Sequence, residues 1–272
     1  MLLQAFGPES EWPAQDLVGF SDEFDPALTL AAYQSGVFPM PLGETGGQVA
    51  GVDAMGWWSP MRRGILPLTG LRVSRSLRKT AQHYTTSIDR DFEQVLTRCA
   101  DPDREGGWID RRVRSVFTDL HRSGWVHSVE VWDSADRLVG GLYGISLGGL
   151  FAGESMFHDH QYGRDASKVA LIRLVEELSH GADPTTRVLD VQWVTPHLAS
   201  LGAIEVPRRR YLGMVAAALE VASPAWPAAE GSTRPVHPRT LPQIDTTQIN
   251  PTQINPTQID TTRTGPTGGD DA

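Results

Sequence analysis

The chain has 272 residues, enough for one large domain or two small ones, and its eight tryptophans and other apolar residues suffice for a core. Its formal net charge of −9 excludes a protein that coats nucleic acid with its whole surface, and its single cysteine, Cys99, excludes an intramolecular disulfide or a thiolate metal cluster. No apolar stretch is long enough for a membrane span and the N-terminus lacks a signal-peptide pattern, so we expect a cytoplasmic protein without membrane contact.

The first half of the chain is predicted to be mainly helical. Residues 1–20 have the composition of a loop, and the glycine-rich residues 42–56 predict another loop. A helix is expected after Asp25, which stands at the N-cap position before Pro26, and it should end at Gly36. Further helices are expected from Ser74 to about His83, from Ile88 to Ala100, and from Asp110 to Gly124.

The second half changes to an alternating pattern. Residues 127–133, 137–149 and 150–157 predict three strands of an antiparallel meander. An amphipathic helix over 166–181, a strand around Asp190 and a terminal helix after Pro207 follow. We therefore expect an α+β fold with a mostly antiparallel sheet and helices on one of its faces.

The C-terminus has a different composition. From Ser223 onward the chain is rich in Pro, Thr, Gln and Asn, and a pentapeptide recurs as QIDTT, QINPT, QINPT and QIDTT over residues 243–262. Such repeats bury too little apolar surface to offset the entropy of ordering. Residues 223–272 are therefore predicted to be a disordered, low-complexity tail.

The segment between Arg62 and Lys79 is basic in an acidic chain. A helix that begins after Ser74 would place several of its cations on one face. Such a face is either simply solvated or contacts phosphates, and spacing alone does not decide between the two. The basic residues of the segment are Arg62, Arg63, Arg72, Arg75, Arg78 and Lys79.

Polar residues in apolar strands indicate a site. Asp190 and Gln192 alternate with apolar residues, so a regular strand would present both on one face, next to the turn at Thr195-Pro196-His197. Glu154 lies between Gly153 and Ser155 in the third meander strand, where a carboxylate belongs either to an exposed face or to a site. His158 and His160 lack a third ligand, so we expect no metal site.

Seven segments together resemble the leucyl/phenylalanyl-tRNA–protein transferases. They occur in the order of that family and cover about residues 20–215. They are AAYQSGVFP (31–39), WWSP (57–60), VSRSLRKT (73–80), HRSGWVHSVEVW (121–132), VGGLYGISLGGLFAGESMF (139–157), ASKVAL (166–171) and DVQWVTPHLASLGAIEVPRR (190–209).

The resemblance implies an enzyme that moves Leu or Phe, and less often Met, from aminoacyl-tRNA to the α-amino group of a protein with N-terminal Arg or Lys. The product would carry a degradation signal of the N-degron pathway. Neither ATP nor another cofactor would be needed, and we expect a monomer. The implied architecture is a small N-terminal domain (1–70), an acyltransferase domain similar to the GNAT enzymes (71–222) and the tail (223–272).

The resemblance also assigns roles to residues. Asp190 and Gln192 match the acid and amide of the family's D-x-Q motif, and Glu154 matches a carboxylate that binds the cationic acceptor or its amine. These three are the expected catalytic residues. The expected substrate-binding residues are Trp57 or Trp58 with Trp108 around adenosine, Phe151, Leu174 and Leu178 around the Leu or Phe side chain, and Ser155 and His197. The expected tRNA-binding residues are Arg72, Arg75, Arg78 and Lys79.

The chain departs from the family pattern at several positions, none of them in the D-x-Q pair. Met40 stands in an FPM sequence where FPW is usual, and Phe117 stands where a tyrosine is common. Two alternatives stay open. One is a GNAT-like or Fem-like aminoacyltransferase that acts on another amine, and the other is an RNA-binding module without catalysis. Residues 161–168, QYGRDASK, lack the glycine-rich turn that an acetyl-CoA enzyme would need.

Overall fold

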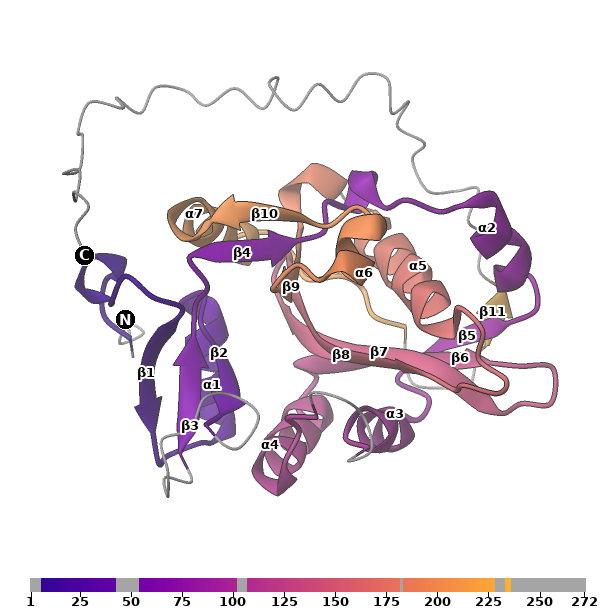
Figure 1. Cartoon of the computed structure of the whole chain (residues 1–272), viewed down its shortest axis with the longest axis horizontal. Helices are drawn as coiled ribbons and strands as arrows, with labels where there is room; N and C mark the ends of the chain where they lie inside the picture. Colours follow the sequence, from indigo (N-terminus) through magenta and orange to yellow (C-terminus); the bar gives the residue numbers. More distant parts are fainter. Residues whose placement is uncertain (1–5, 43–53, 102–106, 182, 228–232, 236–272) are drawn as a thin grey trace, which may run out of the picture. The chain divides into compact units, whose positions relative to one another are not determined.

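The computed structural model describes residues 6–42, 54–101, 107–181, 183–227 and 233–235. Within these ranges the fold is α+β, as predicted, with a smaller and a larger sheet (Figure 1). None of the helices in the described ranges has the length and apolar character that crossing a membrane requires. Short 3-10 turns lie at Glu9–Glu11, Leu68–Gly70 and Pro184–Thr186.

The smaller sheet and one helix form the N-terminal part. The sheet is antiparallel, in the order β1 (Leu17–Ser21), β3 (Met55–Trp58), β2 (Phe38–Pro41). Helix α1 (Pro26–Gln34) begins where predicted, because the Asp25 carboxylate accepts a hydrogen bond of 2.8 Å from the amide of Leu28. The prediction of a loop over residues 1–20 was wrong at its end, where the chain forms β1. This strand has five residues and is only partly buried, so its sequence shows little of the apolar–polar alternation that predicts a strand.

The larger sheet contains the predicted meander. Among its described strands, only β8 and β9 pair in parallel. The strands in spatial order are β10 (Ile204–Pro207), β4 (Arg62–Ile65), β9 (Val188–Gln192), β8 (Leu150–His158), β7 (Leu138–Leu147), β6 (Val126–Trp132), β5 (Thr85–Ile88) and β11 (Arg234–Pro235).

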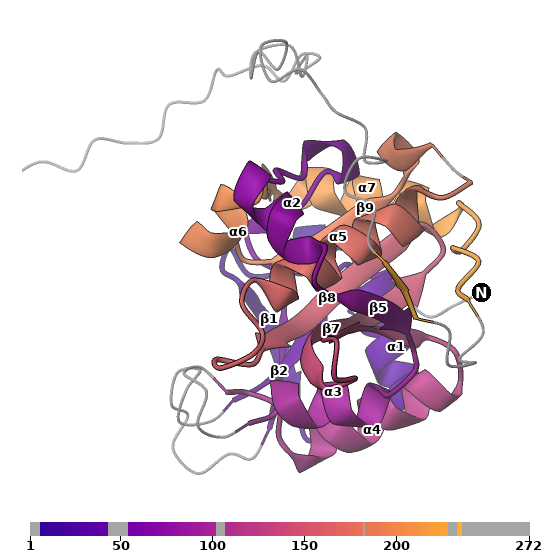
Figure 2. The same ribbon diagram turned by 90° about the vertical axis from the view of Figure 1, so that its right-hand side faces the viewer.

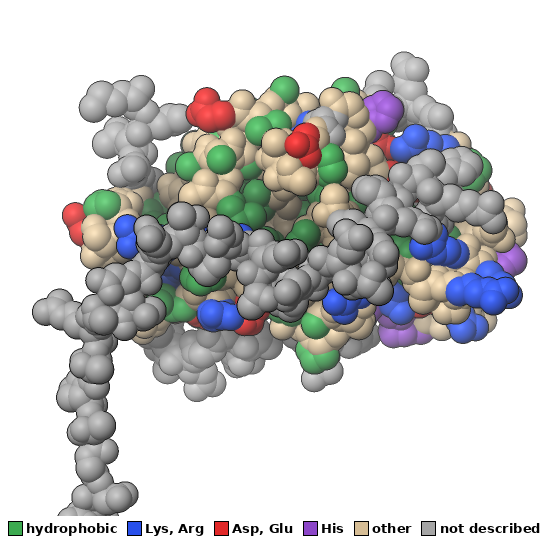
Figure 3. Space-filling view, turned by 90° about the horizontal axis from the view of Figure 1, so that it is seen from above, with side chains coloured by type: hydrophobic (Ala, Val, Ile, Leu, Met, Phe, Trp, Pro, Cys, Tyr) green, Lys and Arg blue, Asp and Glu red, His purple; other side chains and the backbone are tan. Residues whose placement is uncertain are grey.

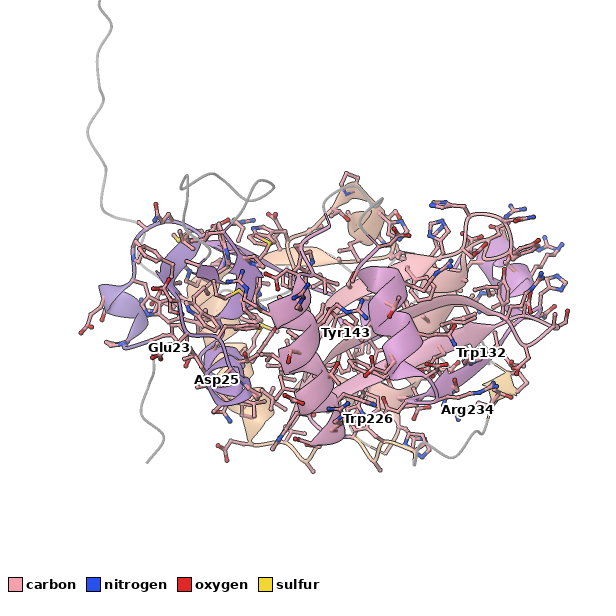
Figure 4. All side chains as sticks on the ribbon, turned by 90° about the horizontal axis from the view of Figure 1, so that it is seen from below. Glu23, Asp25, Trp132, Tyr143, Trp226 and Arg234 are labelled. Atoms are coloured by element: carbon pink, nitrogen blue, oxygen red, sulfur yellow. The ribbon has the colours of Figure 1, made fainter. Side chains whose placement is uncertain are left out.

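Helices cover both faces of the larger sheet, which corrects the expectation of helices on one face (Figures 1 and 2). Helices α2 (Arg75–Ala81) and α5 (Ala166–Ser179) lie on one face, and α3 (Phe92–Cys99) and α4 (Arg111–Arg122) lie on the other. Strand β7 shows why both faces need cover, because it is buried at nearly every position. Its successive side chains point to opposite faces of the sheet: Leu142 joins the core under α5, whereas Tyr143 packs against α3 and α4 (Figure 4).

Several short strands escaped prediction. Strand β5 occupies the start of the helix expected from Ile88, and α3 begins only at Phe92, where Asp91 caps the amide of Gln94 at 3.1 Å. Strands β4 and β10 were also missed, because four residues carry little periodicity. The chain passes from the smaller to the larger sheet between Trp58 and Arg62, which is before residue 70; the predicted domain limits stay predictions.

The parallel pair β8–β9 separates partway along its length. The two strands are paired at Leu150–Val188, Phe151–Leu189 and Ala152–Asp190. Beyond Asp190 the chain turns into α6 (Pro196–Ser200), and α7 (Arg208–Leu219) follows β10. Because the backbones lose their pairing beyond Ala152, the later residues of β8 and β9 are free to border an opening.

Ordered contacts continue past Ser223, which corrects the predicted start of the disordered tail. The Trp226 ring stacks on His127 at a centroid distance of 4.4 Å, and its Nε1 donates to Ser146 at 3.1 Å. Arg234–Pro235 pairs with β5 as strand β11, and the Arg234 guanidinium binds Glu177 (Figure 4). The repeats over 243–262 lie outside the described residues.

Candidate active site between strands β8 and β9

A cavity of about 430 Å³ opens where β8 and β9 separate. Its floor is apolar and comes from the sheet and α5, while its polar groups come from the ends of β8 and β9. The smaller sheet contributes residues of β2 to its rim. The lining residues are Phe38, Pro39, Met40, Trp108, Leu142, Gly153, Glu154, Ser155, Met156, Leu171, Leu174, Leu189, Val191, Gln192, Trp193, Thr195 and Leu198.

Glu154 is the acidic residue of this lining. Burial raises the pKa of Glu154 to about 8, and the buried Asp190 carboxylate adds to this effect, whereas the Tyr33 hydroxyl and Arg63 oppose it. Tyr33 comes from α1, is 1% exposed, and has a pKa raised well above its ordinary value by burial and by Glu154. Its hydroxyl approaches Glu154 without a hydrogen bond of standard geometry. A carboxyl group near pKa 8 exchanges a proton at physiological pH.

Asp190 lies beneath the cavity in a buried ion pair. Arg63 of β4 binds it through two hydrogen bonds, from Nε at 2.8 Å and from Nη2 at 2.5 Å. The Tyr211 hydroxyl of α7 donates a third hydrogen bond at 2.8 Å. Both Asp190 and Arg63 are 0% exposed, and the carboxylate with its partners raises the pKa of Arg63 against the opposing effect of burial. These hydrogen bonds hold Asp190 in place beneath the cavity.

Asp190 fixes the neighbouring Gln192. The amide of Gln192 donates to Asp190 Oδ1 at 3.0 Å, and Gln192 adopts a left-handed backbone conformation with φ of 56°. Leu189 and Val191 line the cavity and Asp190 does not, so regular alternation would turn Gln192 away from it. The left-handed backbone ends this alternation, and Gln192 lines the cavity together with Trp193. The side-chain amide of Gln192 donates to Glu154 at 3.4 Å. The prediction that Asp190 and Gln192 share one exposed strand face is corrected by this turn.

The sequence comparisons decide the family. Residues 22–61 match the family described as leucyl/phenylalanyl-tRNA protein transferase N-terminal domain, and residues 65–216 match leucyl/phenylalanyl-tRNA protein transferase. A leucyl/phenylalanyl-tRNA–protein transferase of Rhodopseudomonas palustris (strain BisB18) is 46% identical over 205 residues, which cover 73% of this chain and 83% of that protein. A leucyl/phenylalanyl-tRNA–protein transferase of Ruegeria sp. (strain TM1040) is 46% identical over 209 residues, which cover 75% of this chain and 92% of that protein.

The chain belongs to the leucyl/phenylalanyl-tRNA–protein transferase family. Among solved structures, the C-terminal domain of a putative lysylphosphatidylglycerol synthetase from Agrobacterium fabrum covers 65% of this chain and 55% of that chain, at 10% identity and a TM-score of 0.34. That likeness is too low to support an argument about fold or function.

Five of the residues assigned by the family resemblance meet at the cavity of this transferase. They come from β8, β9, α5 and the segment before α4, although they are up to 84 positions apart in the sequence, from 108 to 192. The fold thus brings to one cavity residues that are far apart in the sequence. The five are Trp108, Glu154, Ser155, Leu174 and Gln192.

Other assigned residues lie elsewhere. Phe151 and Leu178 belong to the core between α5 and the sheet, with exposures of 0% and 1%, and do not line the cavity. Trp57 is buried in the smaller sheet with its Nε1 bonded to Ser21, and Trp58 Nε1 bonds the Met40 carbonyl at 3.3 Å. Both tryptophans hold the smaller sheet together, and neither is among the residues that line this cavity.

Trp193 lines the cavity, and the sequence reasoning missed it. Its ring contacts Phe38 at 5.0 Å and Trp58 at 5.9 Å, and its Nε1 donates to Asp16 at 3.1 Å. These contacts fix the ring at the cavity wall. The missed signal was an aromatic residue directly after the D-x-Q motif, which regular strand alternation would have directed away from the site.

Arg63 was also missed, because the sequence presents it as one cation of a basic run. The structure separates that run into two groups. Arg63 is buried on Asp190, and Arg62 pairs with Glu205 at 3.3 Å. The exposed basic residues lie on or next to α2, where Lys and Arg side chains gather at one end of the face seen in Figure 3. They include Arg72, Arg75 and Lys79, with Arg78 partly buried.

His197 lines a second cavity rather than the first. This cavity has a volume of about 470 Å³ and shares Met156 with the reaction cavity, so the two are neighbours. Burial, together with Lys168 and His158, lowers the pKa of His197.

Proposed function

We propose that this chain transfers Leu or Phe from aminoacyl-tRNA to the α-amino group of proteins with N-terminal Arg or Lys. The observation that carries the proposal is the cavity at the β8–β9 separation, with one proton-exchanging carboxyl group above an apolar floor. The family supplies the identity of donor and acceptor, and the cavity supplies a place for each. We also propose that the chain acts as a monomer in the cytoplasm.

The apolar floor suits the side chain of the transferred amino acid. Leu171 and Leu174 are three residues apart on α5 and therefore lie on one helix face, and Leu142 and Leu189 come from the sheet below. The shape of a pocket lined by leucines favours apolar side chains that are not branched at Cβ over β-branched ones. Discrimination against a side chain one methylene different amounts to about 1–3 kcal/mol.

The two tryptophans suit the terminal adenosine of the donor. Trp108 and Trp193 both line the cavity, and aromatic rings bind a nucleobase by stacking in a sequence-tolerant way. Trp193 is positioned by Phe38 and Asp16, so its ring needs little ordering when a base arrives. We assign the adenosine wall to Trp108 and Trp193 instead of Trp57 or Trp58.

Glu154 suits the acceptor. An α-ammonium group has a pKa of roughly 7.7–8.0, close to the pKa of about 8 of Glu154, so proton transfer between them is nearly balanced. In the reaction a C–N bond forms and the ester C–O bond breaks. The acceptor nitrogen loses two protons: Glu154 takes one, and the other goes to the ribose oxygen that leaves. The same carboxylate attracts a cationic acceptor end.

Gln192 and Asp190 have supporting roles in this proposal. Gln192 donates to Glu154 and would orient that carboxylate toward the amine. Asp190 has no access to the cavity and already accepts hydrogen bonds from Arg63, Tyr211 and Gln192. We therefore assign Asp190 to positioning and Glu154 to proton transfer.

We also propose that the larger sheet is related to the GNAT acyltransferases. Three features support this: an antiparallel meander, a parallel β8–β9 pair joined through α5, and a reaction cavity at the point where that pair separates.

The decisive experiment measures transfer of labelled leucine from leucyl-tRNA to a peptide with N-terminal Arg, without ATP or acetyl-CoA. Transfer to this peptide, but not to its N-acetylated form, is expected. Transfer only to other amines would favour a Fem-like acceptor. Binding of leucyl-tRNA without any transfer would favour a non-catalytic tRNA-binding module.

A further inference from the structure

The second cavity is lined by groups that the proposed reaction does not use. It lies between the end of β8, the start of α5, α3 and α6. We call it the α5 cavity. Its lining residues are Arg98, Asp101, Met156, Phe157, His158, His160, Asp165, Ser167, Lys168 and His197.

The start of α5 offers hydrogen-bond donors to this cavity. Asp165, at the N-cap position, has a left-handed backbone with φ of 58°, and its side chain caps no helix amide. Its carboxylate instead accepts a bond of 2.6 Å from Lys168. No partner is found in the described part of the chain for the amides of Ser167 and Lys168. Free amides at a helix start bind anions.

Ser167 provides a second, independent sign of a ligand. Its residue is 6% exposed, it lines the cavity, and its hydroxyl has no hydrogen-bond partner among the described residues. The Ser167 hydroxyl oxygen is accessible from the cavity, so its hydrogen-bonding capacity is open to a ligand there. A ligand oxygen in the α5 cavity would satisfy it.

The charges of the cavity fit one negative charge rather than several. Lys168 uses one of its donors on Asp165, and Arg98 uses one on Asp159 at 2.8 Å. Lysine has three N–H donors and arginine five, so both keep donors for a ligand. The aspartates balance these two cations, which disfavours a pyrophosphate or a free phosphate dianion. A singly charged phosphodiester suits this nearly neutral, donor-rich site.

The position of the cavity identifies the source of the phosphodiester. It adjoins the reaction cavity at Met156, and its wall includes the loop before α5. The hydroxyl of Tyr84, just after α2, contacts the carbonyls of Tyr162 and Arg164 in that loop at 3.1 and 3.0 Å. The loop before α5, which contributes His160 and Asp165 to the cavity, is thus in contact with the segment that follows the basic helix α2.

We propose that the α5 cavity binds the phosphodiester between the last two nucleotides of the tRNA 3′ end, through Ser167, Lys168 and the free amides of α5. The proposal rests on the proposed function, because that function places the terminal adenosine in the neighbouring cavity. Binding of this phosphodiester would hold the donor at a second position, one nucleotide from the reacting ester. The aminoacyl group is then positioned before the acceptor arrives.

The test compares three probes by calorimetric binding to the full chain: adenosine, the dinucleotide CpA, and CpA with an uncharged methylphosphonate linkage. CpA should bind about tenfold more tightly than the methylphosphonate form, since hydrogen bonds to a charged group are worth roughly 1.5–3 kcal/mol. Equal affinity of the charged and uncharged dinucleotides would overturn the proposal.

Variants locate the effect. Ser167→Ala and Lys168→Gln should each reduce CpA affinity several-fold while leaving adenosine affinity unchanged. Arg164→Gln is the matched control, because Arg164 is in the same loop, its side chain is 84% exposed, and it does not line the cavity. Unchanged CpA affinity in both Ser167→Ala and Lys168→Gln would contradict the proposal. Leucine transfer by the wild-type chain, measured separately, tests the proposed function whether or not the α5 cavity binds the phosphodiester.

Discussion

The carboxylate of Asp190 receives hydrogen bonds from Arg63, Tyr211 and the amide of Gln192, and it is fully buried. Arg63 also donates to the Gly36 carbonyl at 3.3 Å, so this cluster joins the smaller sheet's helix region to the larger sheet. Glu154 has a different environment, with burial but no comparable set of donors. At the scale of single residues, these environments support the proposal of separate tasks, in which Asp190 anchors the site and Glu154 exchanges a proton.

Substitution Asp190→Ala should lower the free energy of unfolding by about 3–5 kcal/mol, because it leaves the buried Arg63 guanidinium without a counter-charge. Urea denaturation measures this change. The control is the double variant Arg63→Met/Asp190→Leu, which removes both charges and should recover much of the loss. A fully stable Asp190→Ala variant that nevertheless lost transfer would contradict an anchoring role and favour direct participation in chemistry.

At the scale of elements, the short helix α2 carries exposed cations in a chain of net charge −9. Ser74 caps it at the amide of Leu77 at 3.1 Å, as the sequence predicted. Leu77 and Ala81 bury one side of the helix against the core, and the opposite side presents Arg75 and Lys79 to solvent. The apolar face therefore attaches α2 to the core, and the exposed basic face suits contact with phosphates.

Charge reversal Arg75→Glu/Lys79→Glu should raise KM for aminoacyl-tRNA and leave kcat with bound donor nearly unchanged. Each lost phosphate contact should reduce the slope of log affinity against log salt by about 0.7–0.9. Transfer assays at several salt concentrations measure this. Arg122→Glu is a suitable control, because Arg122 is exposed on α4, across the sheet. A salt slope equal to that of the wild type would contradict phosphate contact by α2.

At the scale of the whole molecule, the described chain continues beyond residue 216, where the family match ends. Trp226 covers His127 and lies 5.7 Å from the ring of Phe151, and Arg234 pairs with the buried Glu177. The segment thus covers an edge of the larger sheet and pairs with β5, which would otherwise present an open edge among the described strands.

Truncation after Ala222 should therefore lower the melting temperature by several degrees, since each kcal/mol corresponds to about 2–4 °C in a domain of this size. Truncation after Pro235 should leave it unchanged and serves as the control. Differential scanning calorimetry separates the two. An unchanged melting temperature after removal of residues 223–272 would show that the contacts of Trp226 and Arg234 add nothing to stability.

Much of this architecture could be predicted because its signals are local. The caps at Asp25, Ser74 and Asp110 and the alternation of the meander each depend on neighbouring residues, and each was confirmed. The helices on the second sheet face were predictable in principle from β7, which is apolar on both faces.

The remaining features depend on contacts across long sequence separations. Arg63 reaches Asp190 over 127 positions, and nothing in a basic run distinguishes a buried arginine from a solvated one. Gln192 lines the cavity although Asp190 does not, because Gln192 has a left-handed backbone, which residue type alone does not indicate. Phe151 and Leu178 have the composition of a substrate pocket, yet packing between α5 and the sheet uses them as core.

The measurement that tests the account most directly is the single-turnover rate of leucine transfer as a function of pH, for the wild type and Glu154→Gln. The wild-type rate should rise through about pH 8, where Glu154 and the acceptor amine both lose a proton. The variant should be slower by about 10²-fold or more and should report only the amine.

Folding of the variant is checked in the same pH series. Because burial raises the folded-state pKa of Glu154 to about 8, this group lowers stability as the pH rises from about 4.5 to 8. Glu154→Gln should accordingly melt no lower than the wild type above pH 8. A folded Glu154→Gln variant that transfers leucine at the wild-type rate would contradict proton transfer by Glu154.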